Sequence, residues 1–193
     1  MYSFFALINR MKLIDRWSLM RNVRKENIQE HSHQTAVIAH ALCVIANKRC
    51  GQNLNAERAG IIALYHDSTE IFTGDMPTPV KYFNDEIKKT YKIIENNWAE
   101  NLLQMLPDDL QEEYSFIKEG EKEPEWIYVK AADTLCAYIK CLDEKSAGNK
   151  EFLEAEASIK TKLEKIKETM PALKIFMEEF LPPFEYSIDK SRI

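Results

Sequence analysis

Residues 28–47 read IQEHSHQTAVIAHALCVIAN, and this stretch decides how the chain is expected to fold. Its apolar residues recur at helical spacing between Ala36 and Ile45, which predicts a largely buried α-helix. Gly51 follows closely and marks the expected end of that helix. His31 stands near the start of the helix, at a position that is not an obvious place for a core residue.

The same helical spacing continues on both sides of this stretch. Only 5 glycines are present, too few for the many tight turns of a β-sandwich or barrel. Asn55 is an expected N-cap, and the Pro-containing segment 73–79 cannot continue the helix that precedes it. The expected fold class is therefore all-α, in one domain. Helices are expected over 4–13, 28–47, 55–72, 85–106, 126–145, 151–168 and 172–181, with a short one opened by Pro107 and a loop at 16–21.

The overall composition argues against several classes of function. The 193 residues carry a formal net charge of −5, which does not favour nucleic acid or an anionic membrane as a general partner. No apolar run approaches the roughly 20 residues that a membrane helix needs, and no basic signal-peptide start is visible. The 4 cysteines form no Cys-x-x-Cys pair, which argues against a zinc ribbon or a thioredoxin-type site. A reducing cytoplasm is the expected location.

Three of the expected helices carry a metal-binding type of side chain where a hydrophobic residue is expected. These residues are His31, the pair His66-Asp67, and Asp133. A charged aspartate in such apolar surroundings is costly unless it is paired or bound to a metal. Each residue alone could be a satisfied structural polar group. Together, imidazole and carboxylate groups suit a divalent first-row metal such as Mn, Co, Fe or Zn.

The pattern of His31, His66-Asp67 and Asp133 resembles the H…HD…D signature of the HD-domain phosphohydrolases. Longer strings narrow the resemblance to the bacterial YfbR-type 5′-deoxynucleotidases. The strings are Arg16-Trp17-Ser18-Leu19-Met20-Arg21-Asn22, Glu30-His31-Ser32, Tyr65-His66-Asp67-Ser68-Thr69-Glu70, Thr73-Gly74-Asp75-Met76-Pro77-Thr78-Pro79-Val80-Lys81-Tyr82 and Ala132-Asp133-Thr134-Leu135-Cys136-Ala137-Tyr138.

This resemblance covers nearly the whole chain. It implies a single HD-domain helical bundle over 1–193, with a metal-binding core at about 28–145 and the C-terminal helices 151–181 packed on it. It implies a cytoplasmic, metal-dependent homodimer that removes the 5′-phosphate from deoxyribonucleoside monophosphates, with neither a nucleic acid polymer nor a membrane as partner. In this pattern His31 and Asp133 contact the substrate as well as the metal. The match is weak over 119–123, so base recognition stays undecided.

The other histidines limit the site to one ion. A helix turns about 100° per residue, so His33 and His40 point about 200° and 180° away from His31. Neither can join His31 at the same ion, which leaves His31 and His66 as the imidazole ligands. Two imidazoles and two carboxylates roughly balance a divalent charge and leave room for water and phosphate.

Two further carboxylates are candidates for proton transfer. Glu70 follows the pair His66-Asp67 by four and three residues, which predicts one shared helix face. It is the candidate for positioning the attacking water, although a surface glutamate near a helix end is the plainer interpretation. Asp75 could protonate the leaving 5′-oxygen or hold the sugar, and its plainer role is to form a turn.

Arg16 and Trp17 complete the candidate site. A guanidinium can hold a phosphate bidentately and stay charged, so Arg16 is the expected phosphate-binding and catalytic residue. The Trp17 ring could pack where a 2′-hydroxyl projects and so reject ribonucleotides. The plainer interpretation is that Trp17 fastens the first helix to the core while Arg16 caps a helix or faces solvent.

Two other functions remain open at this stage. One is a different HD enzyme, either a phosphodiesterase or a nucleoside triphosphohydrolase. Such enzymes often carry additional histidine ligands or basic residues, which are scarce here. The other is a degenerate HD domain that acts as a regulatory binding module, which should have lost a ligand or Glu70.

Overall fold

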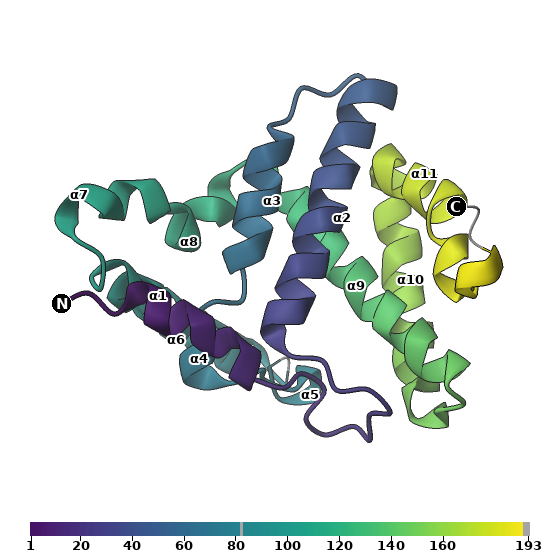
Figure 1. Cartoon of the computed structure of the whole chain (residues 1–193), viewed down its shortest axis with the longest axis horizontal. Helices are drawn as coiled ribbons and strands as arrows, with labels where there is room; N and C mark the ends of the chain where they lie inside the picture. The colour runs from purple at the N-terminus through teal and green to yellow at the C-terminus, as the bar shows by residue number, and fades with distance from the viewer. Residues whose placement is uncertain (82, 191–193) are drawn as a thin grey trace.

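The computed structural model describes residues 1–81 and 83–190, and it confirms the all-α expectation. Within these residues the one β feature is an isolated bridge between Asp15 and Asn27. Tyr82, the last residue of the string quoted above from Thr73 onward, lies outside the described residues. The α-helices in Figure 1 are α1 (Phe4–Ile8), α2 (Ile28–Arg49), α3 (Ala56–Tyr65), α4 (Glu70–Thr73), α5 (Thr78–Lys81), α6 (Asp85–Leu103), α7 (Asp108–Gln111), α8 (Phe116–Glu119), α9 (Trp126–Ser146), α10 (Leu153–Thr169) and α11 (Pro171–Glu179).

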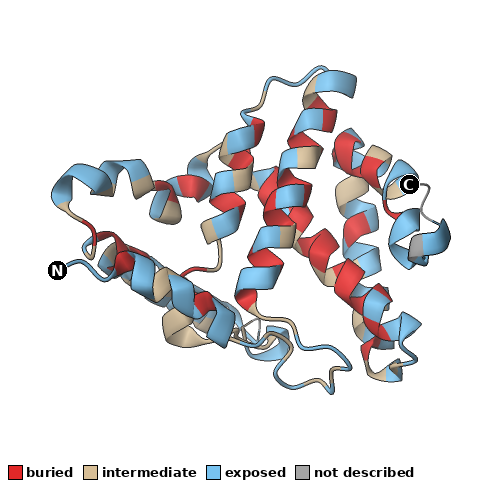
Figure 2. Cartoon of the chain, in the orientation of Figure 1, coloured by how far each residue is buried: buried red, intermediate tan, exposed pale blue. Residues whose placement is uncertain are grey.

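The core lies where α2, α3 and α9 meet. Helix α2 packs against both of the others. Helix α10 packs against α9, and α11 packs against α2 (Figure 1). Buried residues line the facing sides of these helices (Figure 2). Leu42 of α2 and Leu135 of α9 are fully buried there, and each such leucine stabilises the fold by about 2 kcal/mol through removal of apolar surface from water.

The start of α2 is set by a capping box. The Asn27 side chain accepts hydrogen bonds from the backbone N–H groups of Gln29 and Glu30, both at 3.0 Å, and the Glu30 carboxylate accepts from the Asn27 N–H. Such a cap satisfies donors that a helix start leaves unpaired. Because the helix begins at Ile28, His31 lies in its first turn and faces the other helices.

The predicted helix over 55–72 is wrong in its second half. Helix α3 begins at the expected Asn55 cap but ends at Tyr65, and residues 66–69 form a tight turn before α4. Ser68 N–H bonds to the Tyr65 carbonyl and Glu70 N–H to the Asp67 carbonyl, so i→i+3 bonds replace the helical i→i+4 bonds. Aspartate, serine and threonine compete with helical hydrogen bonding, which explains the break. Glu70 therefore opens α4 and does not extend one face of α3.

Smaller differences lie at element ends. The first helix becomes a 3₁₀ turn at Asn9–Leu13, and α6 ends at Leu103, three residues before its predicted end. Pro107 is the N-cap of α7, because its φ and ψ are not yet helical. The charged segment 119–123, where the family match is weak, contains the end of α8 and the 3₁₀ turn Gly120–Lys122. No helix in the described residues combines the length and apolar character needed to cross a bilayer.

Candidate active site and metal centre

The four predicted ligands converge at one point although they come from three separate segments. His31 Nε2 lies 3.1 Å from Asp133 Oδ1 and 3.6 Å from Asp67 Oδ2. His66 Nε2 lies 3.1 Å from Asp67 Oδ2 and 4.0 Å from Asp133 Oδ1. One donor atom each from His31, His66 and Asp133 lie within 4.8 Å of one another, which is a spacing that one cation can bridge. The structure thus brings together all four residues.

His66 is oriented with its Nε2 toward this point. Its Nδ1 lies 2.7 Å from the Ala63 carbonyl oxygen, which can only accept, so Nδ1 carries the proton. This backbone contact fixes the orientation of the His66 ring, as similar contacts do for histidines that bind metals. The buried Nε2 has no hydrogen-bond partner among the described residues, although a carboxylate oxygen is close by. Burial opposes a positive charge on His66, but Asp67 outweighs burial and raises the pKa of His66.

The other three groups have the charge states that metal binding requires. Burial and the charge of Arg16 lower the pKa of His31, so this imidazole is neutral at physiological pH. Burial alone would raise the pKa values of Asp67 and Asp133. The neighbouring His66 lowers the pKa of Asp67, and Lys130 lowers that of Asp133, so both are carboxylates.

The residues present fit a divalent metal. Two imidazole nitrogens and carboxylate oxygens gather in a buried place, and in the neutral ring the His66 Nε2 lone pair faces an acceptor rather than a donor. Two acceptors at about 3 Å repel unless a positive charge lies near both. The donor set is of the mixed imidazole and carboxylate type that first-row divalent ions prefer. His33 and His40 are exposed on α2, as the helical geometry predicts, and do not enter the cluster.

Arg16 lies beside this cluster and retains unused donors. Its Nη1 donates to Glu26 Oε2 at 2.7 Å, and its side chain is 12% exposed. Its buried Nε has no hydrogen-bond partner among the described residues. Burial disfavours the charge, but Glu26, Asp67 and Asp133 together raise the pKa of Arg16, so the guanidinium stays charged. The alternative that Arg16 caps a helix or faces solvent is therefore wrong.

Trp17 is held at several points in a conformation unusual for a large residue. Its φ is 57°, in the left-handed region that non-glycine residues rarely adopt. Its backbone N–H donates to Asp75 Oδ2 at 3.1 Å, and its indole N–H donates to Glu26 Oε2 at 3.2 Å. Its ring packs on Phe152, with 5.3 Å between ring centroids. Such strain persists where surrounding contacts fix it, and it is common at functional sites.

Glu70 is buried, which overturns the plainer interpretation of a surface glutamate. Glu70 is the first residue of α4, and its Oε2 has no hydrogen-bond partner among the described residues. Burial and the negative charges of Asp67 and Asp75 raise the pKa of Glu70 well above its ordinary value. Burial also raises the pKa of Asp75, whose Oδ2 is engaged by the Trp17 N–H. Both carboxyl groups therefore keep a proton to higher pH than exposed carboxyl groups do.

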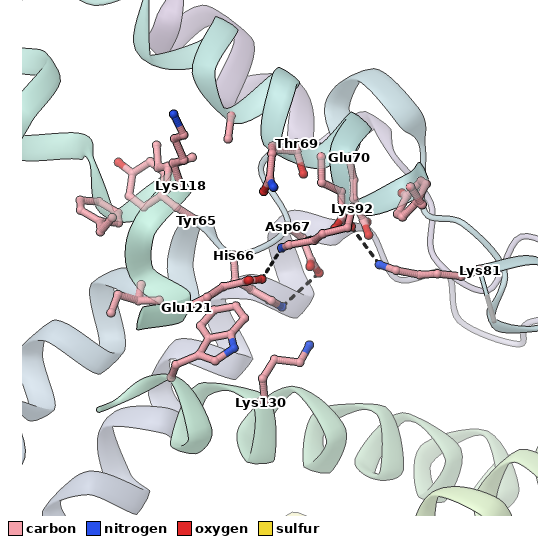
Figure 3. A pocket seen from close by; sticks show the side chains of 18 of the residues that line it. Tyr65, His66, Asp67, Thr69, Glu70, Lys81, Lys92, Lys118, Glu121 and Lys130 are labelled. Carbon is pink, nitrogen blue, oxygen red and sulfur yellow. Dashed lines mark hydrogen bonds and ion pairs between the residues drawn. The ribbon is translucent and has the colours of Figure 1, made fainter. Parts of the chain in front are cut away.

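A cavity of about 340 Å³, lined in part by α6 and α8, reaches His66 and Asp67 of this cluster. His66, Asp67 and Glu70 line it together with several lysines, among them Lys81 and Lys130 (Figure 3). Lys81 pairs with Glu95 at 3.0 Å, and Lys130 pairs with Asp133. Sequence reasoning did not single out these lysines. The available signals were the position of Lys81 just after the Pro-rich string and the three-residue spacing between Lys130 and Asp133.

A family model described as 5′-deoxynucleotidase YfbR-like matches residues 3–184. The chain belongs to this family. It is 48% identical over 189 residues to the 5′-deoxynucleotidase YfbR of Escherichia coli, which covers 97% of this chain and 94% of the relative. It is 50% identical over 189 residues to a 5′-deoxynucleotidase of Vibrio vulnificus, with 97% and 96% of the two chains covered. The resemblance seen in the sequence strings is thus confirmed.

Solved structures of HD-domain proteins share the fold of this YfbR-like chain. An HD-domain phosphohydrolase from Listeria innocua matches with a TM-score of 0.81 at 23% identity, over 94% of this chain and 88% of that one. The HD phosphohydrolase DatZ of cyanophage S-2L, solved bound to dA and one catalytic Zn²⁺ ion, matches with a TM-score of 0.67 at 19% identity, covering 94% and 96%. At these identities the likeness shows the fold, and it confirms the predicted HD-domain class.

Proposed function

We propose that this YfbR-like chain is a metal-dependent 5′-deoxynucleotidase, which hydrolyses deoxyribonucleoside 5′-monophosphates to the deoxyribonucleoside and phosphate. The observation that carries the proposal is the convergence of His31, His66, Asp67 and Asp133 beside a buried, charged Arg16. Metal ligands and a phosphate-binding cation are the two parts that phosphate monoester hydrolysis needs in one place. Family membership supports the same reaction.

The four residues of the cluster are proposed as ligands of one divalent ion. When bound, such an ion supplies Lewis acidity toward phosphate oxygens and makes a bound water more acidic. The chain itself holds the His31 imidazole neutral and the two aspartates ionised, as their pKa directions indicate. Co, Mn and other first-row ions are the candidates, and the Zn²⁺ of the structural neighbour DatZ belongs to the same class.

Three side chains are proposed to act on the phosphate ester. The unpaired Nε–H of Arg16 donates to a phosphate oxygen, and the guanidinium stabilises the negative charge of the phosphate. Glu70, buried with a raised pKa, positions the attacking water and takes or returns a proton. Asp75, also with a raised pKa, is proposed to protonate the leaving 5′-oxygen or to hold the sugar. His31 and Asp133 lie at the same point and are proposed to contact the substrate.

Trp17 is proposed to exclude ribonucleotides. Its contacts with Asp75, Glu26 and Phe152 keep the ring next to Arg16, with the guanidinium carbon 5.9 Å from the ring centroid. A phosphate held by Arg16 therefore brings its sugar close to the indole. A 2′-hydroxyl pressed against that ring meets both a steric clash and the loss of its hydrogen bonds, which together cost several kcal/mol.

The decisive experiment measures phosphate release from a panel of deoxyribo- and ribonucleoside 5′-monophosphates with several divalent metals. We expect hydrolysis of the deoxynucleotides, little of the ribonucleotides and weak dependence on the base. Trp17→Ala should narrow the gap between the two sugars by about tenfold, whereas Arg16→Ala should lower turnover on all substrates equally, since phosphate is common to them. Bound metal without phosphate release from any monophosphate would instead support a regulatory binding module.

Location and assembly are also proposed from the family resemblance. We expect a cytoplasmic homodimer that acts on free nucleotides. Sedimentation or light scattering of the purified chain tests the oligomeric state, and a mass near 22.5 kDa would contradict the dimer.

A further inference from the structure

Glu26 occupies the space between the two residues that are proposed to read phosphate and sugar. A single oxygen, Glu26 Oε2, accepts hydrogen bonds from Arg16 Nη1 at 2.7 Å and from the Trp17 indole N–H at 3.2 Å. Its side chain is 12% exposed, as is that of Arg16. Because both donors meet at one atom, neither side chain can rotate away without breaking a bond to the acceptor that they share.

The backbone holds Glu26 in register with Arg16. The Arg16 N–H donates to the Glu26 carbonyl at 2.8 Å, and the Ile28 N–H donates to the Ile14 carbonyl at 3.0 Å. Asp15 and Asn27 form the isolated antiparallel bridge between these bonds. Asn27 is also the N-cap of α2, so this clip is continuous with the helix that carries His31. The position of Glu26 is thus tied to that of the metal cluster.

The other contacts of Trp17 restrain different parts of the residue. Asp75 receives the backbone N–H, and the Asn22 side chain donates to the Trp17 carbonyl at 3.3 Å. Phe152 contacts the ring, but an apolar contact does not select one rotation of the indole. The hydrogen bond to Glu26 is directional and therefore does. For Arg16, burial disfavours the charge, and Glu26 is the strongest of the carboxylates that offset this and raise its pKa.

We infer that Glu26 is a specificity-determining positioning residue, which fixes Arg16 and Trp17 relative to each other so that phosphate binding places the sugar against the indole. This inference rests on the proposed function. It predicts that phosphate affinity and sugar discrimination change together when Glu26 is altered. A residue that only stabilised the fold would lower the rates on both sugars by the same factor and leave their ratio unchanged.

The test compares kcat and KM for dAMP and AMP in the metal-loaded wild-type protein and in Glu26→Ala. In Glu26→Ala we expect KM for dAMP to rise by about tenfold or more. We expect the dAMP:AMP ratio of kcat/KM to fall by a similar factor, because each change reflects the loss of a charge-assisted hydrogen bond. Glu26→Gln keeps an acceptor at the same place and should retain most of the ratio. Glu26→Asp shortens the side chain by one methylene and so withdraws the acceptor, and it should lose most of the dAMP:AMP ratio. Because this variant keeps the negative charge, it tests the position of the acceptor apart from its charge.

Lys25→Ala is the matched control. It removes an exposed ion pair of similar length, Lys25 to Asp15 at 2.6 Å, from the neighbouring position of the same segment. We expect it to leave the ratio unchanged. A readout independent of activity is the indole N–H resonance of Trp17, one of 3 in the chain, which is assigned by its loss in Trp17→Phe. It should shift in Glu26→Ala and Glu26→Asp and stay in place in Lys25→Ala.

The outcomes separate this inference from the proposed function. If the wild-type protein releases no phosphate from dAMP, the proposed function fails. If it discriminates between the sugars, but Glu26→Ala and Glu26→Asp retain the ratio and the Trp17 resonance, the assignment of Glu26 is overturned. An equal loss on dAMP and AMP, with the ratio intact, also overturns it, because that result describes a structural role alone.

Discussion

Helix α9 carries two charged clusters, and they differ in how well the chain satisfies them. Near the end of the helix, Glu144 is 1% exposed and accepts from Val23 N–H at 2.9 Å, Arg24 N–H at 3.2 Å and Asn149 Nδ2 at 2.7 Å. Lys140, one turn earlier, donates to the same carboxylate and to the Arg24 carbonyl. Glu144 thus anchors the loop that follows Arg16 and Trp17.

Near the start of the same helix, Asp133 has a different environment. It pairs with Lys130, but on its other side it faces two histidines and comes near Asp67. The His66 Nε2 there has no hydrogen-bond partner among the described residues. A buried polar group normally finds its partners within the protein, as Glu144 does. Both clusters are buried and charged, so the difference between the proposed ligand cluster and the structural ion pair lies in incomplete pairing.

The largest effect is expected from removing a ligand. His66→Ala or Asp67→Ala should lose bound metal, measured by elemental analysis, and should lose activity by more than about a thousandfold. Chelation should do the same reversibly, and Co or Mn should restore turnover. Full activity in excess chelator, with no metal detected, would contradict the comparison. The incomplete pairing of the Asp133 cluster would then not be explained by metal binding.

Glu70→Ala should separate chemistry from metal binding. We expect the variant to keep its metal and still bind deoxynucleotide, while kcat falls by about two to four powers of ten, the scale of general acid–base catalysis. Exposed Glu57 at the start of α3 offers a control, since Glu57→Ala removes a carboxylate without touching the site. Near wild-type turnover in Glu70→Ala would make Asp75 the leading candidate for proton transfer.

A pair of substitutions on α9 tests the comparison through stability. In metal-free protein, Glu144→Gln should lower the free energy of unfolding by about 3 kcal/mol, because it breaks a satisfied buried network. Asp133→Asn, on the same helix, should lower the free energy of unfolding much less. This substitution removes one negative charge from a place where carboxylate oxygens and the unpaired His66 Nε2 lie close together. Urea unfolding in chelator measures both. An equal loss in the two variants would mean that the Asp133 cluster is as well satisfied as that of Glu144.

The pH dependence of the unfolding free energy tests how strongly the Glu144 cluster is satisfied. We expect this effect to be smaller than those of the substitutions above. Burial acts to raise the pKa of Glu144, but the bonds from Lys140, Val23 and Asn149 outweigh it and lower the pKa from 4.5 to about 2. The unfolded chain therefore binds the proton more readily, so this stabilisation is present above pH 4.5 and is lost as pH falls toward 2. The difference in unfolding free energy between wild type and Glu144→Gln should shrink from pH 6 to pH 3. A constant difference would contradict the lowered pKa.

The sequence alone determined the helical class, the course of the long helices and the set of candidate ligands. Apolar spacing predicted α2 and α9 closely, and the Asn55 cap placed the start of α3. His31, His66, Asp67 and Asp133 stood out because each interrupts or ends an apolar pattern. These are local signals, since periodicity and capping depend on residues only a few positions apart.

The tertiary structure decided which of these polar residues lack partners. Glu144 and Asp133 both lie in one apolar helix, and only the loop bonds from Val23 and Arg24 reveal that Glu144 is satisfied. The break at 66–69, the burial of Glu70 and the shared acceptor Glu26 likewise became visible only in the fold. The physical reason is that hydrogen-bond partners and burial are set by segments far apart in the chain, whose meeting depends on packing that spacing along one helix does not contain.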